Sequence, residues 1–483
     1  MWRRATAATL FAGALMLAGC TVGPKYRRPQ AEVPTVYKEA GNWKTAEPNE
    51  QHLGGNWWEV FQDPQLNALE EQVTVSNQNL KAAEAMYRQA RALVRFNRAD
   101  YFPTLSVSPN ATRTKISSNT PPANAISNGK TLTDIQLPFD VSYEIDAWGR
   151  IRNNVAASRA EAQASAADLA TVNLSMHAEL AMFYFQARTL DAQEQLLNSN
   201  VAQFEQALQL NQNRFDGGVG SEVEVEQART QLETTRAQAI DVGVQRAQFE
   251  HAVATLIGKP ASSFTLPPLP LQTPPPAIPV GLPSELLERR PDIASAERLM
   301  AAANARIGVA KAAYYPILSL TGTGGFESGS IANLLTGPSA LWAFGGAAVE
   351  TLFDGGRRRA TSDQATAAYD QSVAVYRGTV LTGFQQVEDN LAALRILENE
   401  AKTQNVAVVA AQKSLDLSVQ RYEGGVTSYL EVTVAQSAAL SDQVTAVNIL
   451  GRRMVAAVQL IQAIGGGWDS SSIPKNPEKV ASK

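Results

Sequence analysis

The sequence predicts a mixed α and β fold in which one unit, helix–strand–strand–long helix–helix, occurs twice. Three observations support this prediction. Similar segments recur in the same order along the 483 residues. One stretch alternates strictly between apolar and polar residues, as strands do. One long proline-free stretch carries apolar residues three, four or seven positions apart, as coiled-coil helices do.

The internal repeat rests on three ordered matches. The matched pairs are residues 101–106 with 314–319, Gly149-Arg150 with Gly356-Arg357, and residues 214–219 with 421–426. The last two pairs share one offset of 207 residues, so the stretch between them has the same length in both halves. We therefore predict a duplicated unit, with one repeat at residues 63–265 and the other at 284–466.

Three further segments surround the repeats. Residues 266–283 are proline-rich and predict an extended connector, because proline cannot continue a helix. Residues 20–62 precede the first repeat, and residues 467–483 form a C-terminal tail.

Each repeat begins with a helix and two strands. Asp63-Pro64 is typical of a helix start, since proline is favoured at the first helical position. This helix is expected to run to about Ala99, and its counterpart from Asp292 to about Ala313. Strands are predicted at residues 104–117, 134–146, 316–326 and 340–353. The second of these carries the clearest signal, because every odd position is apolar and every even position is polar or proline.

Each repeat ends with a long helical hairpin, at residues 150–257 and 357–464. At 1.5 Å per residue, the first arm of the first hairpin is about 95 Å long. The glycine pairs Gly217-Gly218 and Gly424-Gly425 are expected to form the turns, because glycine adopts turn dihedral angles without strain.

The strands raise the question of assembly. Residues 134–146 form an apolar face of about the length that crosses a bilayer. Four strands cannot close a barrel, and an open edge in lipid leaves backbone groups unpaired. If these strands cross a membrane, several copies must share one barrel. Two copies supply eight strands and three supply twelve, and strand counting does not choose between them.

The N-terminus predicts export and lipidation. Residues 1–19 have the outline of a secretory signal peptide, with Arg3 and Arg4 before a short apolar run. The run ends in Leu17-Ala18-Gly19-Cys20, which resembles the lipobox of bacterial lipoproteins, so Cys20 is the predicted lipidation site. Thr21 stands where Asp would favour retention in the inner membrane. The alternative is that Cys20 is a buried free cysteine.

The composition of the chain excludes several classes of protein. An apolar fraction of 45% excludes a disordered chain, and a net charge of −4 argues against nucleic-acid binding. The sequence contains no window of 18 consecutive apolar residues, so it does not predict an ordinary transmembrane helix. The three histidines lack metal-ligand spacing, and no catalytic motif is present. We therefore expect no enzymatic activity, no metal and no cofactor beyond the covalent lipid on Cys20.

Motifs along nearly all of the chain after Cys20 resemble the TolC-like outer membrane factor family. They are Cys20-Thr21-Val22-Gly23-Pro24-Lys25-Tyr26 with Arg28-Pro29; Trp57-Trp58 with Phe61, Asp63, Leu66 and Leu69; Arg289-Arg290-Pro291-Asp292-Ile293 with Ala296-Glu297, Ile307-Gly308, Ala310 and Tyr315-Pro316; and Arg421-Tyr422 with Gly425-Val426 and Tyr429-Leu430-Glu431-Val432. The nearest subgroup is the lipoprotein channels of resistance-nodulation-division multidrug efflux systems.

The resemblance implies a homotrimer in the outer membrane of a Gram-negative bacterium. Three chains would share a 12-stranded β-barrel and a periplasmic α-helical barrel, girded by an equatorial belt from the termini and the connector. The implied partners are a periplasmic adaptor (a membrane fusion protein), an inner-membrane resistance-nodulation-division transporter and outer-membrane lipid. The implied activity is passive conduction of small molecules, such as drugs or other toxic compounds.

The resemblance also implies a gate at the periplasmic tip of the helices. Arg421 and Tyr422 match positions that tether neighbouring helices, and Glu224 matches their acidic partner. The alternative is that each is an ordinary solvated residue beside a helix turn, and that the four glycines only form turns.

Two more positions match the narrowest part of that gate. Glu431 matches an acidic ring, which would favour cations, and Leu430 matches an apolar constriction. Val434 stands where many members of the family carry an acidic residue, so a second acidic ring is not expected.

Three other functions remain open at this stage. The same fold could serve as the exit duct of a one-step protein secretion system. A trimeric coiled-coil surface adhesin would carry its strands once, at the end of the chain. A periplasmic lipoprotein scaffold without a pore would not need the alternation of residues 134–146.

Overall fold

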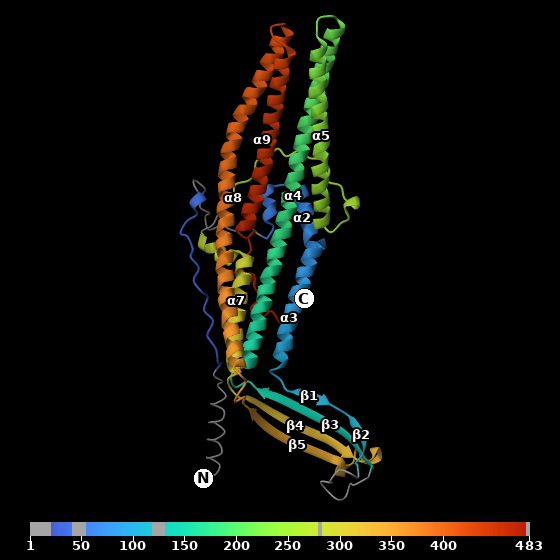
Figure 1. Ribbon diagram of the computed structural model, residues 1–483, viewed down its shortest axis with the longest axis vertical. Helices are drawn as coiled ribbons and strands as arrows, with labels where there is room; N and C mark the ends of the chain where they lie inside the picture. Colours follow the sequence, from blue (N-terminus) through green and yellow to red (C-terminus); the bar gives the residue numbers. More distant parts are fainter. Residues whose placement is uncertain (1–20, 41–54, 118–130, 279–282, 480–483) are drawn as a thin grey trace.

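The protein, described here from a computed structural model, is an elongated molecule with a sheet at one end and long helices leading away from it (Figure 1). The structure describes residues 21–40, 55–117, 131–278 and 283–479. The predicted signal peptide and Cys20 lie outside the described residues.

The sheet contains β1 (Thr104–Val107), β2 (Asn110–Lys115), β3 (Thr131–Ile145), β4 (Ile317–Ser328) and β5 (Ala340–Val349). All pairings are antiparallel, in the order β1-β3-β4-β5, and β2 continues along the same edge of β3 as β1. The two repeats therefore meet in one sheet through β3 and β4, where Ile145 lies opposite Leu318.

Two strand boundaries differ from the prediction. The single strand expected at 104–117 is divided between β1 and β2, because Pro109 has no N–H to donate to the ladder. The strand expected to reach residue 353 ends at Val349, which pairs with Ile317. Its partner β4 begins there, directly after Pro316, so residues 350–353 have no strand to pair with.

Four helices form the long part of the molecule: α4 (Arg150–Asp216), α5 (Glu222–Leu256), α8 (Arg357–Glu423) and α9 (Tyr429–Ala463). Both α4 and α8 have 67 residues, which corresponds to about 100 Å each. They lie side by side in the order α5, α4, α9, α8 (Figure 1).

Nearer the sheet, α4 and α8 pack against different helices. There α3 (Gln78–Ala99) packs on α4, and α7 (Pro291–Ala312) packs between α4 and α8. Two long helices thus run the whole length, and shorter helices follow one another beside them. Short elements complete the described chain: α2 (Pro64–Ser76), α6 (Leu286–Arg289) and 3-10 helices at Lys38–Ala40, Trp57–Phe61, Ala261–Ser263, Pro283–Glu285, Ile331–Asn333, Gly337–Ser339 and Ser470–Ser472.

The first helix is interrupted, contrary to the prediction of one helix from residue 63 to 99. Asn77 separates α2 from α3 and is 2% exposed. Its side-chain oxygen accepts a hydrogen bond from Leu80 N, and its amide donates to Leu256 O at the end of α5. This buried cap starts α3 and joins it to the end of the hairpin.

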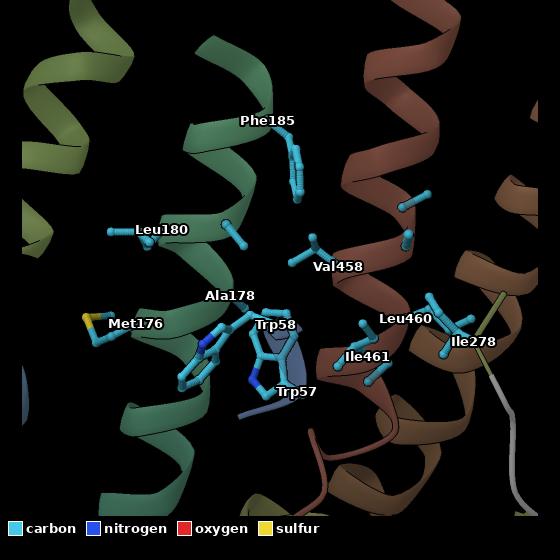
Figure 2. Packing of buried hydrophobic residues seen from close by; sticks show 14 of the residues in the cluster. Trp57, Trp58, Met176, Ala178, Leu180, Phe185, Ile278, Val458, Leu460 and Ile461 are labelled. Carbon is cyan, nitrogen blue, oxygen red and sulfur yellow. The ribbon is translucent and has the colours of Figure 1, made fainter. Parts of the chain in front are cut away.

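The core lies midway along the molecule, where the two repeats meet. Leu180 and Phe185 of α4 and Val458 and Ile461 of α9 belong to one buried cluster, with Trp57 and Trp58 at the same level (Figure 2). Close approach of α4 and α9 depends on Gly451, because a Cβ there would lie 2.4 Å from the hydroxyl oxygen of Thr189.

One helix, α9, is long and apolar enough to cross a membrane by composition alone. It packs instead against α8 and α4, and 44% of its most apolar window is buried within the chain. Its composition therefore fits a core helix of the bundle.

The segments outside the repeats pack along the helices between the sheet and this middle region. Val22 N donates to Trp148 O, and the backbone amides of Lys38 and Glu39 donate to the carboxylate of Glu388. The proline-rich connector is fixed by buried Arg188, which donates to Pro267 O. The tail is held by Glu478, which pairs with Arg98 and Arg159.

A buried ionisable pair fastens α2 to α4. Glu70 Oε2 lies 2.6 Å from His177 Nδ1, both side chains are at most 1% exposed, and Trp58 stacks on the imidazole. Burial raises the pKa of Glu70 well above its usual value and lowers the pKa of His177 to about 4. Burial therefore favours the neutral form of both groups, and in that state the Glu70 hydroxyl donates to His177 Nδ1.

We expect this pair to make the protein less stable as pH rises above 6.5. Between about pH 4.5 and 6.5, the glutamate and histidine together hold one proton in both the unfolded chain and the folded pair. Above about pH 6.5 the unfolded histidine loses its proton while the folded glutamate keeps one, so the free energy of unfolding falls by up to about 1.4 kcal/mol per pH unit. Thermal unfolding of wild type and Glu70→Gln between pH 6.5 and 8 measures this contribution. Equal slopes in the two proteins would contradict it.

Candidate functional site at the turns of the long helices

The turns of both hairpins lie together at the end of the molecule opposite the sheet (Figure 1). They have the same backbone geometry. Val219 N donates to Arg214 O at 2.9 Å, and Val426 N donates to Arg421 O at 2.8 Å. Gly218 and Gly425 have φ angles of 74° and 72°, which favour glycine. The internal repeat thus extends to individual hydrogen bonds.

Tyr422 ties the end of α8 to α4. Its side chain is 3% exposed, and its hydroxyl donates to Asn211 Oδ1 at 2.5 Å. The ring meets Tyr429 edge to face at 5.2 Å, and the Arg214 guanidinium lies 4.8 Å from the ring centroid. With Ala228 and Val432, the two tyrosines form a small apolar cluster of their own.

Burial dominates the electrostatics of the two tyrosines. It raises the pKa of Tyr422, with a further contribution from the negative charge of Glu224, and it raises the pKa of Tyr429 to about 12. Both hydroxyls therefore stay protonated near neutral pH, and Tyr422 remains a hydrogen-bond donor.

Arg421 and Glu431 form an exposed pair across the turn. Arg421 Nη1 lies 3.7 Å from Glu431 Oε2, and the side chains are 57% and 52% exposed. Exposed pairs contribute about 0–1 kcal/mol, so this one is easily broken. The Gly424-Gly425 turn brings both side chains to the tip.

Glu224 has a local role in addition to the one that the resemblance implied. Within one chain it caps α5, since its carboxylate accepts from Ser221 N and its own N–H donates to the Ser221 hydroxyl. Its negative charge also lies close enough to Tyr422 to raise the pKa of that hydroxyl, so Glu224 faces the predicted tether, while the Tyr422 hydroxyl donates to Asn211 and Arg421 pairs with Glu431.

Leu430 and Val434 lie one turn apart on α9 and are 53% and 62% exposed. Val223 of α5 and Val426 of the turn are exposed as well. The tip therefore presents apolar side chains beside the charged pair.

Sequence reasoning did not assign Asn211, Arg214 or Tyr429 to the site, although Tyr429 belongs to a motif that resembles the family. The internal repeat offered a signal for Arg214, which occupies the position of Arg421 in the first half. Asn211 offered none, because its contact with Tyr422 joins residues 211 positions apart.

The contacts at this tip can hold the helices together, and breaking the contacts would release the helices. Within the described ranges, groups of three or more potential metal ligands are absent. The side chains that meet here are hydrogen-bonded, ion-paired or stacked.

The sequence matches the profile of the outer membrane efflux protein family at residues 69–259 and 282–466, which correspond to the two repeats. The toluene efflux pump outer membrane protein TtgF of Pseudomonas putida is 32% identical over 469 residues, covering 94% of this chain and 96% of TtgF. The outer membrane protein OprJ of Pseudomonas aeruginosa is 30% identical over 462 residues, covering 94% and 95%.

Solved structures agree with this match. The outer-membrane channel OprN has a TM-score of 0.87 at 29% identity, with 93% of this chain and 100% of OprN covered. The open state of the MtrE outer membrane channel of Neisseria gonorrhoeae has a TM-score of 0.81 at 26% identity, with 93% and 99% covered.

We expect Tyr422→Phe to loosen the tip while leaving the rest of the fold intact. The change removes the donor to buried Asn211 at a cost of about 1–2 kcal/mol. Amide hydrogen exchange should therefore accelerate near both turns and stay unchanged around Trp57. The matched control is Tyr369→Phe, which makes the same change on α8 far from the turn. Equal exchange in wild type and Tyr422→Phe would show that this bond does not hold the tip.

Proposed function

The chain belongs to the outer membrane efflux protein family, and from this premise we propose how it works as the outer-membrane channel of an efflux pump. The observation that carries the function is the family match across both repeats, together with one continuous body of sheet and long helices. Its location is the outer membrane of a Gram-negative bacterium. The sheet spans the membrane, and the helices extend into the periplasm.

Pore formation requires more than one copy. The outer edges of the sheet, β1 with β2 on one side and β5 on the other, are not paired with each other within the chain. In lipid each unpaired backbone group costs several kcal/mol, so neighbouring copies supply the missing strands. We propose a homotrimer, in which three sheets form one barrel and three helical layers form one tunnel.

The lipid anchor is supported by the position of the residue that follows Cys20. Thr21 lies against Gly149, where the sheet meets α4, and a Cβ on that glycine would lie 2.9 Å from Thr21 Cγ2. An acyl group on Cys20 would therefore enter the bilayer beside the sheet, and each buried CH₂ adds about 0.8 kcal/mol to membrane binding.

A periplasmic adaptor and an inner-membrane transporter of the resistance-nodulation-division class are the proposed partners. The relatives are named as outer-membrane components of efflux pumps, and such a component needs a source of substrate on the periplasmic side. Their names mention toluene, solvents and antibiotics. We propose small, largely apolar compounds as the cargo, conducted passively and without enzymatic activity.

The tip acts as the gate in this proposal. Tyr422 and Arg421 hold the second hairpin through contacts of about 1 kcal/mol each, so an adaptor that binds the tip can release them. Glu431 supplies one negative charge per copy to the narrowest ring. The adhesin alternative is disfavoured, because both halves contribute strands to the sheet. The protein-secretion alternative is disfavoured by the efflux relatives.

We expect the double variant Arg421→Ser, Tyr422→Phe to conduct more current than wild type in a planar bilayer. Losing the tethers favours the open tip, so single-channel conductance should rise several-fold. The control is Lys413→Ser, which removes an exposed charge from the same helix away from the turn. An unchanged conductance in a correctly folded double variant would remove these residues from the gate.

Glu431→Ala should reduce cation selectivity. A ring of carboxylates concentrates cations at a constriction, so its removal should move the reversal potential in a salt gradient toward zero. Glu226→Ala, at an exposed position on α5, removes the same charge outside the predicted ring. If both variants keep wild-type selectivity, Glu431 does not line the constriction.

A further inference from the structure

The junction between β5 and α8 exposes an unusual pair of apolar side chains. Leu352 and Phe353 are 91% and 88% exposed, the highest values among the exposed large hydrophobic residues of the described chain. They follow the end of β5 at Val349, so strand pairing does not engage them. Exposed apolar side chains next to a membrane-spanning sheet indicate contact with lipid or with another molecule.

The first repeat neutralises its arginines at the corresponding junction. Arg150 donates two hydrogen bonds of 2.8 Å to the carboxylate of Glu144. Arg152 pairs with Asp146 at 3.0 Å, and the same carboxylate accepts from the Arg152 backbone. Both positive charges near the sheet are thus balanced within the chain.

The second repeat has an arginine surplus. At the 207-residue offset of the repeat, Arg357 and Arg359 stand where Arg150 and Arg152 do. The two local carboxylates, Glu350 and Asp354, both pair with the intervening Arg358.

The surplus leaves two arginines available for a ligand. Arg358 also lies over the ring of Tyr314, 5.6 Å from its centroid. Arg357 and Arg359 remain exposed, and within the described ranges neither has a carboxylate at ion-pair distance.

We propose that this junction binds a phospholipid of the periplasmic leaflet, with Leu352 and Phe353 among the acyl chains and Arg357 and Arg359 on the headgroup phosphate. The inference rests on the proposed function, because it needs the sheet to span the membrane. Guanidinium groups bind phosphate oxygens through charge-assisted hydrogen bonds, and apolar side chains beside them match the boundary between headgroup and acyl chain. The combination of free positive charge and adjacent apolar surface fits a phospholipid better than a free anion.

The test is native mass spectrometry of the purified, delipidated full-length protein titrated with phosphatidylglycerol. The variant Arg357→Gln, Arg359→Gln should bind about thirtyfold more weakly than wild type, since the two basic residues together contribute about 2 kcal/mol near such a surface. The control Arg229→Gln, Lys413→Gln removes two exposed positive charges far from the sheet and should bind as wild type does. Equal lipid binding by Arg357→Gln, Arg359→Gln and wild type would overturn the proposal. A neighbouring copy that covers the junction would give this same result, and the proposal would then be wrong as well.

A second arm separates a lipid from a free anion. Leu352→Ser, Phe353→Ser should weaken phosphatidylglycerol binding several-fold, and inorganic phosphate at equal concentration should not displace the lipid. Displacement by inorganic phosphate, or unchanged lipid binding by this variant, would overturn the lipid assignment. Conductance of the same wild-type preparation tests the proposed function separately, so its failure is distinguishable from failure of the lipid site.

Discussion

The open edges of the sheet impose the constraint on which the rest of the structure depends. Within one chain, β1 and β2 lie at one edge and β5 at the other. A bilayer supplies no hydrogen-bonding partners, so copies must pair edge to edge and their sheets must curve into a closed barrel. Because each sheet continues directly into α4 and α8, closing the barrel also aligns the helical layers around the same axis. Membrane insertion and tunnel formation are therefore one assembly step.

The two halves share a backbone and have diverged in side chains at both ends. At the tip, Tyr422 is 3% exposed, whereas Phe215 at the matching position of the first half is 40% exposed. At the sheet, the first half pairs its arginines with carboxylates, whereas among the described residues Arg357 and Arg359 of the second half have no carboxylate at ion-pair distance. The second repeat carries both the Tyr422 tether and the two additional arginine charges. The two repeats therefore share one backbone arrangement, and the side chains that differ between them carry the proposed functions.

Hydrophobic periodicity and helix-breaking residues made most of the fold predictable from the sequence. The hairpin expected at residues 150–257 begins at Arg150 and its second helix ends at Leu256, because proline and glycine mark both boundaries and the turn. The interruptions at Asn77 and Pro109 were missed. Asn77 is buried by contact with Leu256, a tertiary effect that local pattern does not contain. The same reason hid Asn211, whereas Arg421, Tyr422 and Glu431 were accessible through family resemblance.

The central claim is that three copies close one conducting barrel. The most direct test is the mass of the detergent-solubilised, pore-active particle, measured by native mass spectrometry on the preparation used for bilayer recording. The account predicts a particle of three lipidated chains, with no current from single chains. A conducting particle that contains one or two copies would contradict it, because the pore would then form without the third copy.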